Sequence, residues 1–194
     1  VLNGSDGKFS SAVDGSEVMV LNRMSSDGDV LLIRQAGSTE GKISVLSSTV
    51  SYEGFSGLHE SSGIASDTPV GTVVSTIDEL DTYPDTQDGE DHPKKGKTRA
   101  DHAKVKVSDS VGDKRVYGVV NSFDTQGKVN VASVGVGSIK VTGSCVGGDL
   151  LESNGDGTAK VQSDDTIKSS TIGKVTVGNS SASVKLVSCV LYCG

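Results

Sequence analysis

The chain has 194 residues, of which 34% are hydrophobic and 4% aromatic, with 25 glycines, 3 prolines and no tryptophan. This length suffices for one domain or for one domain with an extension, but the small apolar share predicts a thin core and association between copies. The net charge of −7 argues against nucleic-acid binding, because attraction to phosphates needs a basic surface.

Residues 1–50 read as short β segments separated by turns. Segments 17–23, 29–35 and 41–52 mix apolar and polar residues at near-alternating spacing, and the turn sequences SSDGD (25–29) and AGSTEG (36–41) lie between them. Fifty residues of this kind cannot close a core alone, so we expect a β stem that needs partner chains. The apolar residues expected to face the stem axis or a neighbouring chain are Val30, Leu32, Ile43 and Val45.

Residues 51–194 continue the β pattern at intervals of about ten residues, typical of a β barrel or sandwich. The predicted strands cover 71–78, 104–109, 116–123, 128–143, 148–153, 159–165, 172–178 and 182–193. Residues 79–103 carry an acidic run followed by a basic run and are predicted to form a charged loop. The one weak helix candidate, 75–83, is interpreted as loop or a single turn. The fold class is therefore all-β, with a stem (1–50) and a compact antiparallel domain (51–194).

The sequence predicts no cofactor and no metal site. Cys145, Cys189 and Cys193 lack paired spacing, which favours free thiols in a protein made in a reducing cytosol. His92 and His102, next to aspartates, are interpreted as loop residues. No apolar run approaches the ~20 residues of a membrane span. Because residue 1 is Val rather than Met, we expect a fragment or a processed product.

The sequence YEGFSGLHESSG (52–63) holds the strongest candidates for catalysis. Ser56, His59 and Glu60 lie within five residues, and a serine nucleophile needs a base to take its proton. Local spacing does not establish such a group, since most triads are assembled from distant segments. The favoured interpretation is a polar joint between stem and domain. The catalytic alternative is self-cleavage of the chain near residues 52–60.

Two stretches resemble the C-terminal regions of bacteriophage tail-fibre, tailspike and neck-appendage proteins. Residues 21–52, with an R-x-x-S-D-G turn and G-x-I-S-V, resemble the segment before the C-terminal chaperone of such fibres. VYGVV (116–120), GDLLESNGDGTAKVQ (148–162) and SSTIGKVT (169–176) resemble the β-rich domains that follow. In the helical self-cleaving chaperones of such fibres, an arginine or lysine follows the serine. None follows Ser56, so the dyad chemistry of those chaperones is not carried over.

The resemblance implies a virion structural protein that is made in the bacterial cytoplasm. It would form a homotrimer, with the rest of the phage fibre as a further partner. Residues 51–194 would drive trimerisation and folding, as intramolecular chaperone domains do. Two alternatives remain open. One is a permanent tip that binds a receptor on the host cell surface, with loop 79–103 as the contact. The other is an autoproteolytic chaperone.

Overall fold

The computed structural model describes residues 11–35, 37–53, 56–83, 85–87, 90–124 and 127–193. Within these ranges the chain forms strands, turns and bends and contains no helix, which confirms the all-β prediction. The chain divides into two compact units, Val1–Phe55 and Ser56–Gly194. The core described below lies in the second unit.

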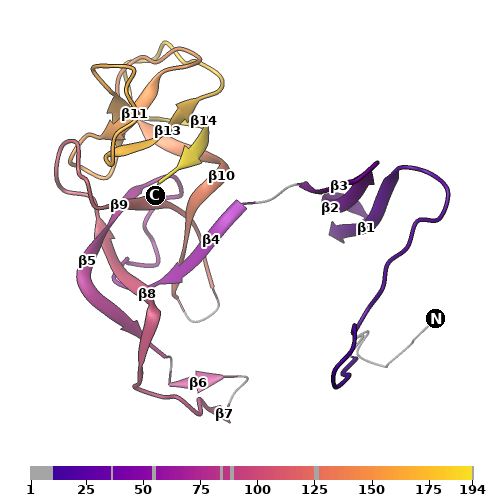
Figure 1. The fold of residues 1–194 in the computed structure, drawn as a ribbon. Coiled ribbons are helices and arrows are strands. Elements are labelled where there is room, and N and C mark those ends of the chain that lie inside the picture. The colour runs from indigo at the N-terminus through magenta and orange to yellow at the C-terminus, as the bar shows by residue number, and fades with distance from the viewer. Residues whose placement is uncertain are drawn as a thin grey trace. The chain divides into compact units, whose positions relative to one another are not determined.

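The N-terminal unit holds a three-stranded antiparallel sheet in the order β1-β2-β3 (Figure 1). Its strands are β1 (Gly28–Gln35), β2 (Ser38–Leu46) and β3 (Thr49–Glu53). Ser47, in the tight turn between β2 and β3, has a φ of +54° and donates its backbone N–H to Asp27. The Arg23 side chain holds the turn before β1 through the carbonyl oxygens of Ser26 and Asp29.

The strand predicted over 17–23 is wrong for the single chain. Those residues have no regular secondary structure, and Val18, Met19, Val20 and Leu21 are all exposed. A strand needs a partner that takes its backbone hydrogen bonds. The described part of this chain pairs no segment with 17–23, so its apolar pattern alone does not make a strand.

Five strands of the C-terminal unit close into a barrel. They are β10 (Val129–Val141), β11 (Leu150–Ser153), β12 (Ala159–Val161), β13 (Thr171–Val175) and β14 (Lys185–Tyr192). Antiparallel pairing follows the order β12-β11-β13-β14-β10, and a parallel bridge between Val141 and Ala159 closes the circle. Ile139, Leu151 and Ile172 lie in its interior, each at 0% exposure. This bears out the predicted β barrel in the C-terminal domain.

The N-terminal half of β10 continues the same nine-stranded sheet beyond the barrel. There it pairs with β4 (Ser56–Ser61) and with β9 (Val116–Phe123), which continues to β5 (Val73–Thr82) and β8 (Thr98–Val107). The outer strands approach each other where Val105 donates its N–H to the carbonyl of Ser62 at 2.9 Å. A separate cluster of buried apolar side chains packs in this part of the fold. The 13-residue β10 thus serves two cores, which explains its unbroken β pattern.

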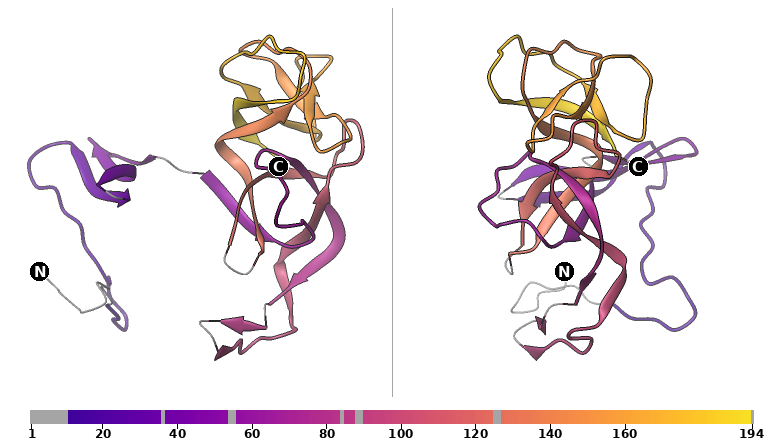
Figure 2. Two further views of the ribbon diagram at one scale, coloured as in Figure 1. Left: turned by 180° about the vertical axis from the view of Figure 1, so that it is seen from behind. Right: turned by 90° about the vertical axis from the view of Figure 1, so that its left-hand side faces the viewer.

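The loop predicted over 79–103 is wrong for most of that range. Strand β5 continues to Thr82, β8 begins at Thr98, and two short strands, β6 (Thr86–Gln87) and β7 (Glu90–Asp91), pair between them. Figures 1 and 2 show these strands as an arm that projects from the rest of the C-terminal unit. Charged residues sit on strands here because arm side chains are largely exposed to water, so alternation with apolar residues is not required.

Candidate functional site

The segment singled out in the sequence, 52–63, ends one unit and begins the next. Tyr52 pairs with Ile43 of β2 near the end of β3, whereas Ser56–Ser61 is strand β4 of the C-terminal unit. Six residues of β4 pair with β10, from Ser56 opposite Gly135 to Ser61 opposite Val129. Most of the segment is therefore regular strand.

His59 and Glu60 are not brought together. Adjacent residues of a strand point to opposite faces of the sheet, and the contacts of the two side chains differ accordingly. The imidazole of His59 lies against the Tyr117 ring, with 5.6 Å between ring centroids. The carboxylate of Glu60 pairs with Arg99 and, at 3.6 Å, with Lys128. The side chain of Ser56 lies outside the described residues. This geometry gives no base-to-carboxylate contact between His59 and Glu60.

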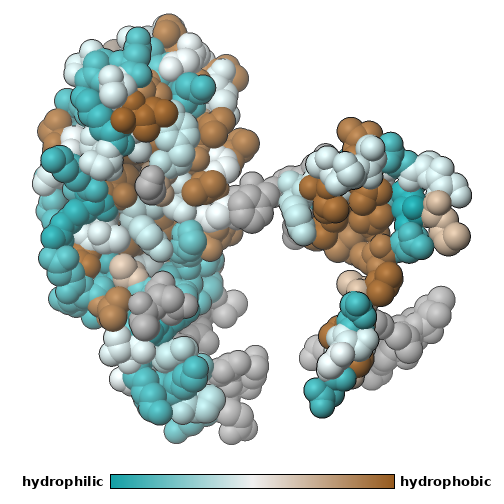
Figure 3. All heavy atoms as spheres, viewed as in Figure 1, coloured by the Kyte–Doolittle hydropathy of each residue, from teal (hydrophilic) through white to brown (hydrophobic). Residues whose placement is uncertain are grey.

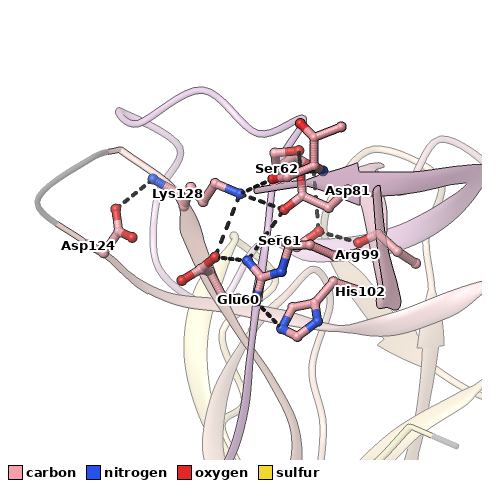
Figure 4. A network of polar contacts seen from close by, with 10 residues as sticks. Glu60, Ser61, Ser62, Asp81, Arg99, His102, Asp124 and Lys128 are labelled. Carbon is pink, nitrogen blue, oxygen red and sulfur yellow. Dashed lines mark hydrogen bonds and ion pairs between the residues drawn. The ribbon is translucent and has the colours of Figure 1, made fainter. Parts of the chain in front are cut away.

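Glu60 instead belongs to a charge cluster centred on Asp81, shown in Figure 4. Asp81 is 2% exposed, and its carboxylate accepts hydrogen bonds from Lys128 Nζ at 2.6 Å and from Ser62 Oγ at 2.8 Å. Arg99 Nη1 lies 3.9 Å from the same carboxylate, and Arg99 Nη2 donates to His102 Nε2 at 2.6 Å. The members come from β4, β5, β8 and the residues just after β4 and just before β10.

Hydrogen bonding decides the charge of Asp81. Burial alone raises the pKa of this carboxyl. The hydrogen bonds from Lys128, Ser62 and the backbone N–H of Thr82 outweigh burial, so the net pKa lies below the usual range. Asp81 is thus a buried carboxylate held by cations, which fastens the base of the arm to β4 and β10. Such an arrangement binds strands together and leaves no open reactive group.

A second carboxylate, that of the half-buried Asp113, accepts hydrogen bonds from buried serines. Ser75 Oγ donates to it at 2.5 Å and Ser108 Oγ at 3.1 Å, and Ser108 also hydrogen-bonds Ser153 at 2.8 Å. Burial raises the pKa of Asp113, but these hydrogen bonds bring it below the ordinary value. Because Ser75, Ser108 and Ser153 are each 0% exposed, this group is also structural.

The arm carries the two histidines that the sequence placed beside aspartates. The His92 ring stacks on Tyr83 with a centroid distance of 5.0 Å, and Lys94 and Arg99 lie over the same Tyr83 ring at 5.1 and 5.5 Å. Among the described residues, no group of three or more His, Cys, Asp or Glu side chains is arranged to hold a metal ion.

The predicted stem contacts do not share one face of the β1–β3 sheet. Ile43 and Val45 lie on the face that also carries Leu31, Val50 and Tyr52, because directly paired residues point the same way. Leu31 and Tyr52 both pair with Ile43, and Val50 pairs with Val45. Ile33 pairs with Gly41 on the same face. We call Leu31, Ile33, Ile43, Val45, Val50 and Tyr52 the apolar stem face.

Val30 and Leu32 stand elsewhere. Leu32 pairs with Lys42 on the opposite face, and a register shift between Asp29 and Leu31 leaves Val30 as the extra residue of a β-bulge. A bulge changes which residues of a strand face the same side, and no residue type in this stretch predicts one. The sequence reasoning therefore missed Leu31 and Ile33.

The three cysteines are buried free thiols. Burial raises the pKa of both Cys189 and Cys193 to about 12, and the neighbouring Cys145 adds to the effect at Cys189. A thiol with so high a pKa is a weak nucleophile, since the thiolate is the reactive form. The thiols act as small apolar side chains of the barrel core.

No protein-family model and no curated protein sequence matches the chain. In the part of the chain that the structure describes, no helix has the length and apolar character needed to cross a membrane.

Proposed function

We propose that this chain is the C-terminal region of a bacteriophage fibre, in which the C-terminal β unit drives trimerisation and folding of the β stem before it. One observation carries the proposal: none of the N-terminal residues whose burial is described is buried, although their sheet has an apolar face. Figure 3 shows brown, hydrophobic spheres gathered over β1–β3. Such a sheet needs a cover, and further copies of the chain provide one of matching shape.

The energetics support association of the stem. On the apolar stem face, Ile33 is 57% exposed, Val50 53% and Tyr52 68%. Burying one large apolar side chain fully contributes roughly 1.5–3 kcal/mol, and small isolated sheets are marginally stable in water. Three copies that cover these side chains mutually would give the stem the core that one copy lacks.

The C-terminal unit can prepare that association. It has two apolar clusters of its own, so its folding does not depend on the stem. Three joined C-terminal units would hold three stems at high local concentration and fix their register. This is the role of an intramolecular chaperone, here with the rest of the fibre as its substrate and the virion as its location.

A matched pair of variants tests the stem interface. Val50 and Leu46 flank the same β2–β3 turn and are 53% and 66% exposed, but they point to opposite faces of the sheet. We expect Val50→Asp to weaken stem association, because a carboxylate would enter the apolar interface. Leu46→Asp should change little. Native mass spectrometry of the full chain gives the oligomeric state, and a monomeric wild type at all accessible concentrations refutes the proposal.

A second candidate function is recognition of a host-cell receptor by the arm, residues 79–103. The arm favours it because it projects from the C-terminal unit and carries many exposed charges. Loops and extensions on a rigid scaffold are frequent binding elements. Binding of labelled protein to a panel of bacteria should be lost when the arm tip is replaced by a short glycine-serine linker. Equal binding by the tip-deleted protein would rule out the arm as the contact.

A further inference from the structure

The outer surface of the barrel has an apolar face on β10 and β14. From residue 135 of β10 onward and along β14, odd-numbered residues point inward, as the burial of Ile139 and Leu191 indicates. A Cβ atom at Gly137 would stand 2.7 Å from the Leu191 side chain, so this position also faces the interior. The even-numbered residues therefore point outward, where a soluble barrel ordinarily carries polar side chains.

Four of these outward residues are apolar and largely exposed. Val134 is 47% exposed, Val136 68%, Leu186 54% and Val190 36%. Val136 pairs directly with Val190, and the next outward pair along the strands is Ser138 with Ser188. Figure 3 shows brown spheres on the part of this unit where Figure 1 draws β10 and β14.

We propose that this face, called the β10–β14 face, is the surface through which the C-terminal units of different copies meet. The proposal rests on the trimer proposed above and names its contact on the C-terminal unit. Exposed apolar residues that are contiguous on two paired strands are typical of an association surface. They differ from single exposed side chains on turns, which are common in monomers.

Charge points to a second copy as the occupant. Each chain carries a net charge of −7, so copies repel one another over most of their surface. Between Val134 and Ser138 on β10, and between Val187 and Tyr192 on β14, there is no charged residue, and Lys140, which pairs with Leu186, lies at the end of the face. An uncharged face meets its own copies without like-charge repulsion, and the Ser138 and Ser188 hydroxyls can both donate and accept hydrogen bonds.

The margin of the face suits an interface as well. At one end lies a shallow hollow of about 330 Å³, lined by Pro69, Val70, Val184, Leu186 and the lysines Lys140 and Lys185. An apolar centre with charged residues at its rim is the usual composition of a protein interface. A hollow next to the centre gives an incoming side chain a place to anchor.

Two substitutions of equal exposure test the face. Val136 is 68% exposed on the β10–β14 face, and Ile167 is 67% exposed in the turn between β12 and β13. In the full chain, Val136→Asp should raise the concentration at which the trimer dissociates by more than about tenfold, as central interface residues do. Ile167→Asp should leave it within about twofold of the wild type. Native mass spectrometry over a dilution series measures both.

A cross-link gives a second readout that does not depend on loss of assembly. Identical residues near a threefold axis approach one another, and the native thiols are buried, so Val136→Cys should give covalently linked chains on mild oxidation. Ile167→Cys should give none. Persistence of a wild-type trimer in Val136→Asp, together with no cross-link in Val136→Cys, overturns this inference and leaves the proposed trimer standing. A monomeric wild type overturns the proposed function itself.

Discussion

Removing Lys128 should expose the cost of the buried charge on Asp81. Lys128→Met keeps the aliphatic stem but deletes the ammonium, whose Nζ lies 2.6 Å from an Asp81 oxygen, 3.6 Å from Glu60 and 3.1 Å from the carbonyl of Thr82. Loss of one partner of a buried pair costs roughly 3–5 kcal/mol of unfolding free energy. Since Ser62, the Thr82 N–H and Arg99 remain near Asp81, we expect about 3 kcal/mol, the lower end of that range.

Urea unfolding at one fixed protein concentration measures this loss, because association would otherwise change the apparent stability. The control is Lys106→Met. Lys106 Nζ lies 2.7 Å from Asp109, nearly the same distance, but the two side chains are 44% and 60% exposed. An exposed pair of this kind contributes less than about 1 kcal/mol. Equal losses in the two variants would refute the argument that burial sets the cost.

The pH dependence follows from the lowered pKa of Asp81. An aspartate titrates near pH 4 in the unfolded chain, so the wild type gains stability from Asp81 above about pH 4 and loses it as the pH falls through the folded pKa. Lys128→Met raises that pKa. The difference in stability between variant and wild type should therefore shrink on acidification. Adding Asp81→Asn to Lys128→Met should restore part of the stability, because no uncompensated charge is then buried.

Three further outcomes are expected. Gly63→Ala should lower the free energy of unfolding by about 2–4 kcal/mol, because the φ of Gly63 is +101° and the new Cβ would stand 2.1 Å from the Val105 carbonyl oxygen. Gly143 has a φ of +83° but open space around it, so Gly143→Ala should cost only about 1–2 kcal/mol. Thermal or urea unfolding measures both. Cys189 is 0% exposed, and its pKa is raised to about 12. It should therefore react with iodoacetamide at pH 8 at least about a hundredfold more slowly in the folded protein than in urea. The assembled chain should show the mass of the uncut protein. A fragment that begins within residues 52–60 and disappears in Ser56→Ala would establish self-cleavage instead.

The C-terminal strands were predictable because each carries its own signal. Residues 128–143 and 182–193 alternate small apolar residues over long runs, and β10 and β14 occupy nearly those ranges. Buried strands need such residues whatever their neighbours are. The existence of these two strands is thus a local property.

Two other predictions failed because the local pattern was incomplete. Residues 17–23 have the pattern of a strand, but a strand also requires a partner, and the single chain supplies none among its described residues. Conversely, the arm forms strands although its sequence is charged, because β5 and β8 hydrogen-bond each other across it. In both cases pairing, not composition, decided the outcome.

The candidate sites show the same division. Spacing placed Ser56, His59 and Glu60 close together, yet strand alternation separates His59 from Glu60. The cluster that Glu60 does join draws Asp81, Arg99 and Lys128 from positions 21 to 68 residues away, and no fixed spacing marks such a group. Only the folded sheet brings them together.

The sequence by itself determined the all-β class and most of the strands of the C-terminal half, because these depend on residue type and on alternation along the chain. The tertiary structure decided the closure of the barrel, the bulge that moves Val30 and Leu32 off the apolar stem face, and the burial of Asp81 among cations. These features depend on contacts between residues far apart in the chain. Register and pairing fix such contacts, and a single strand's sequence encodes neither.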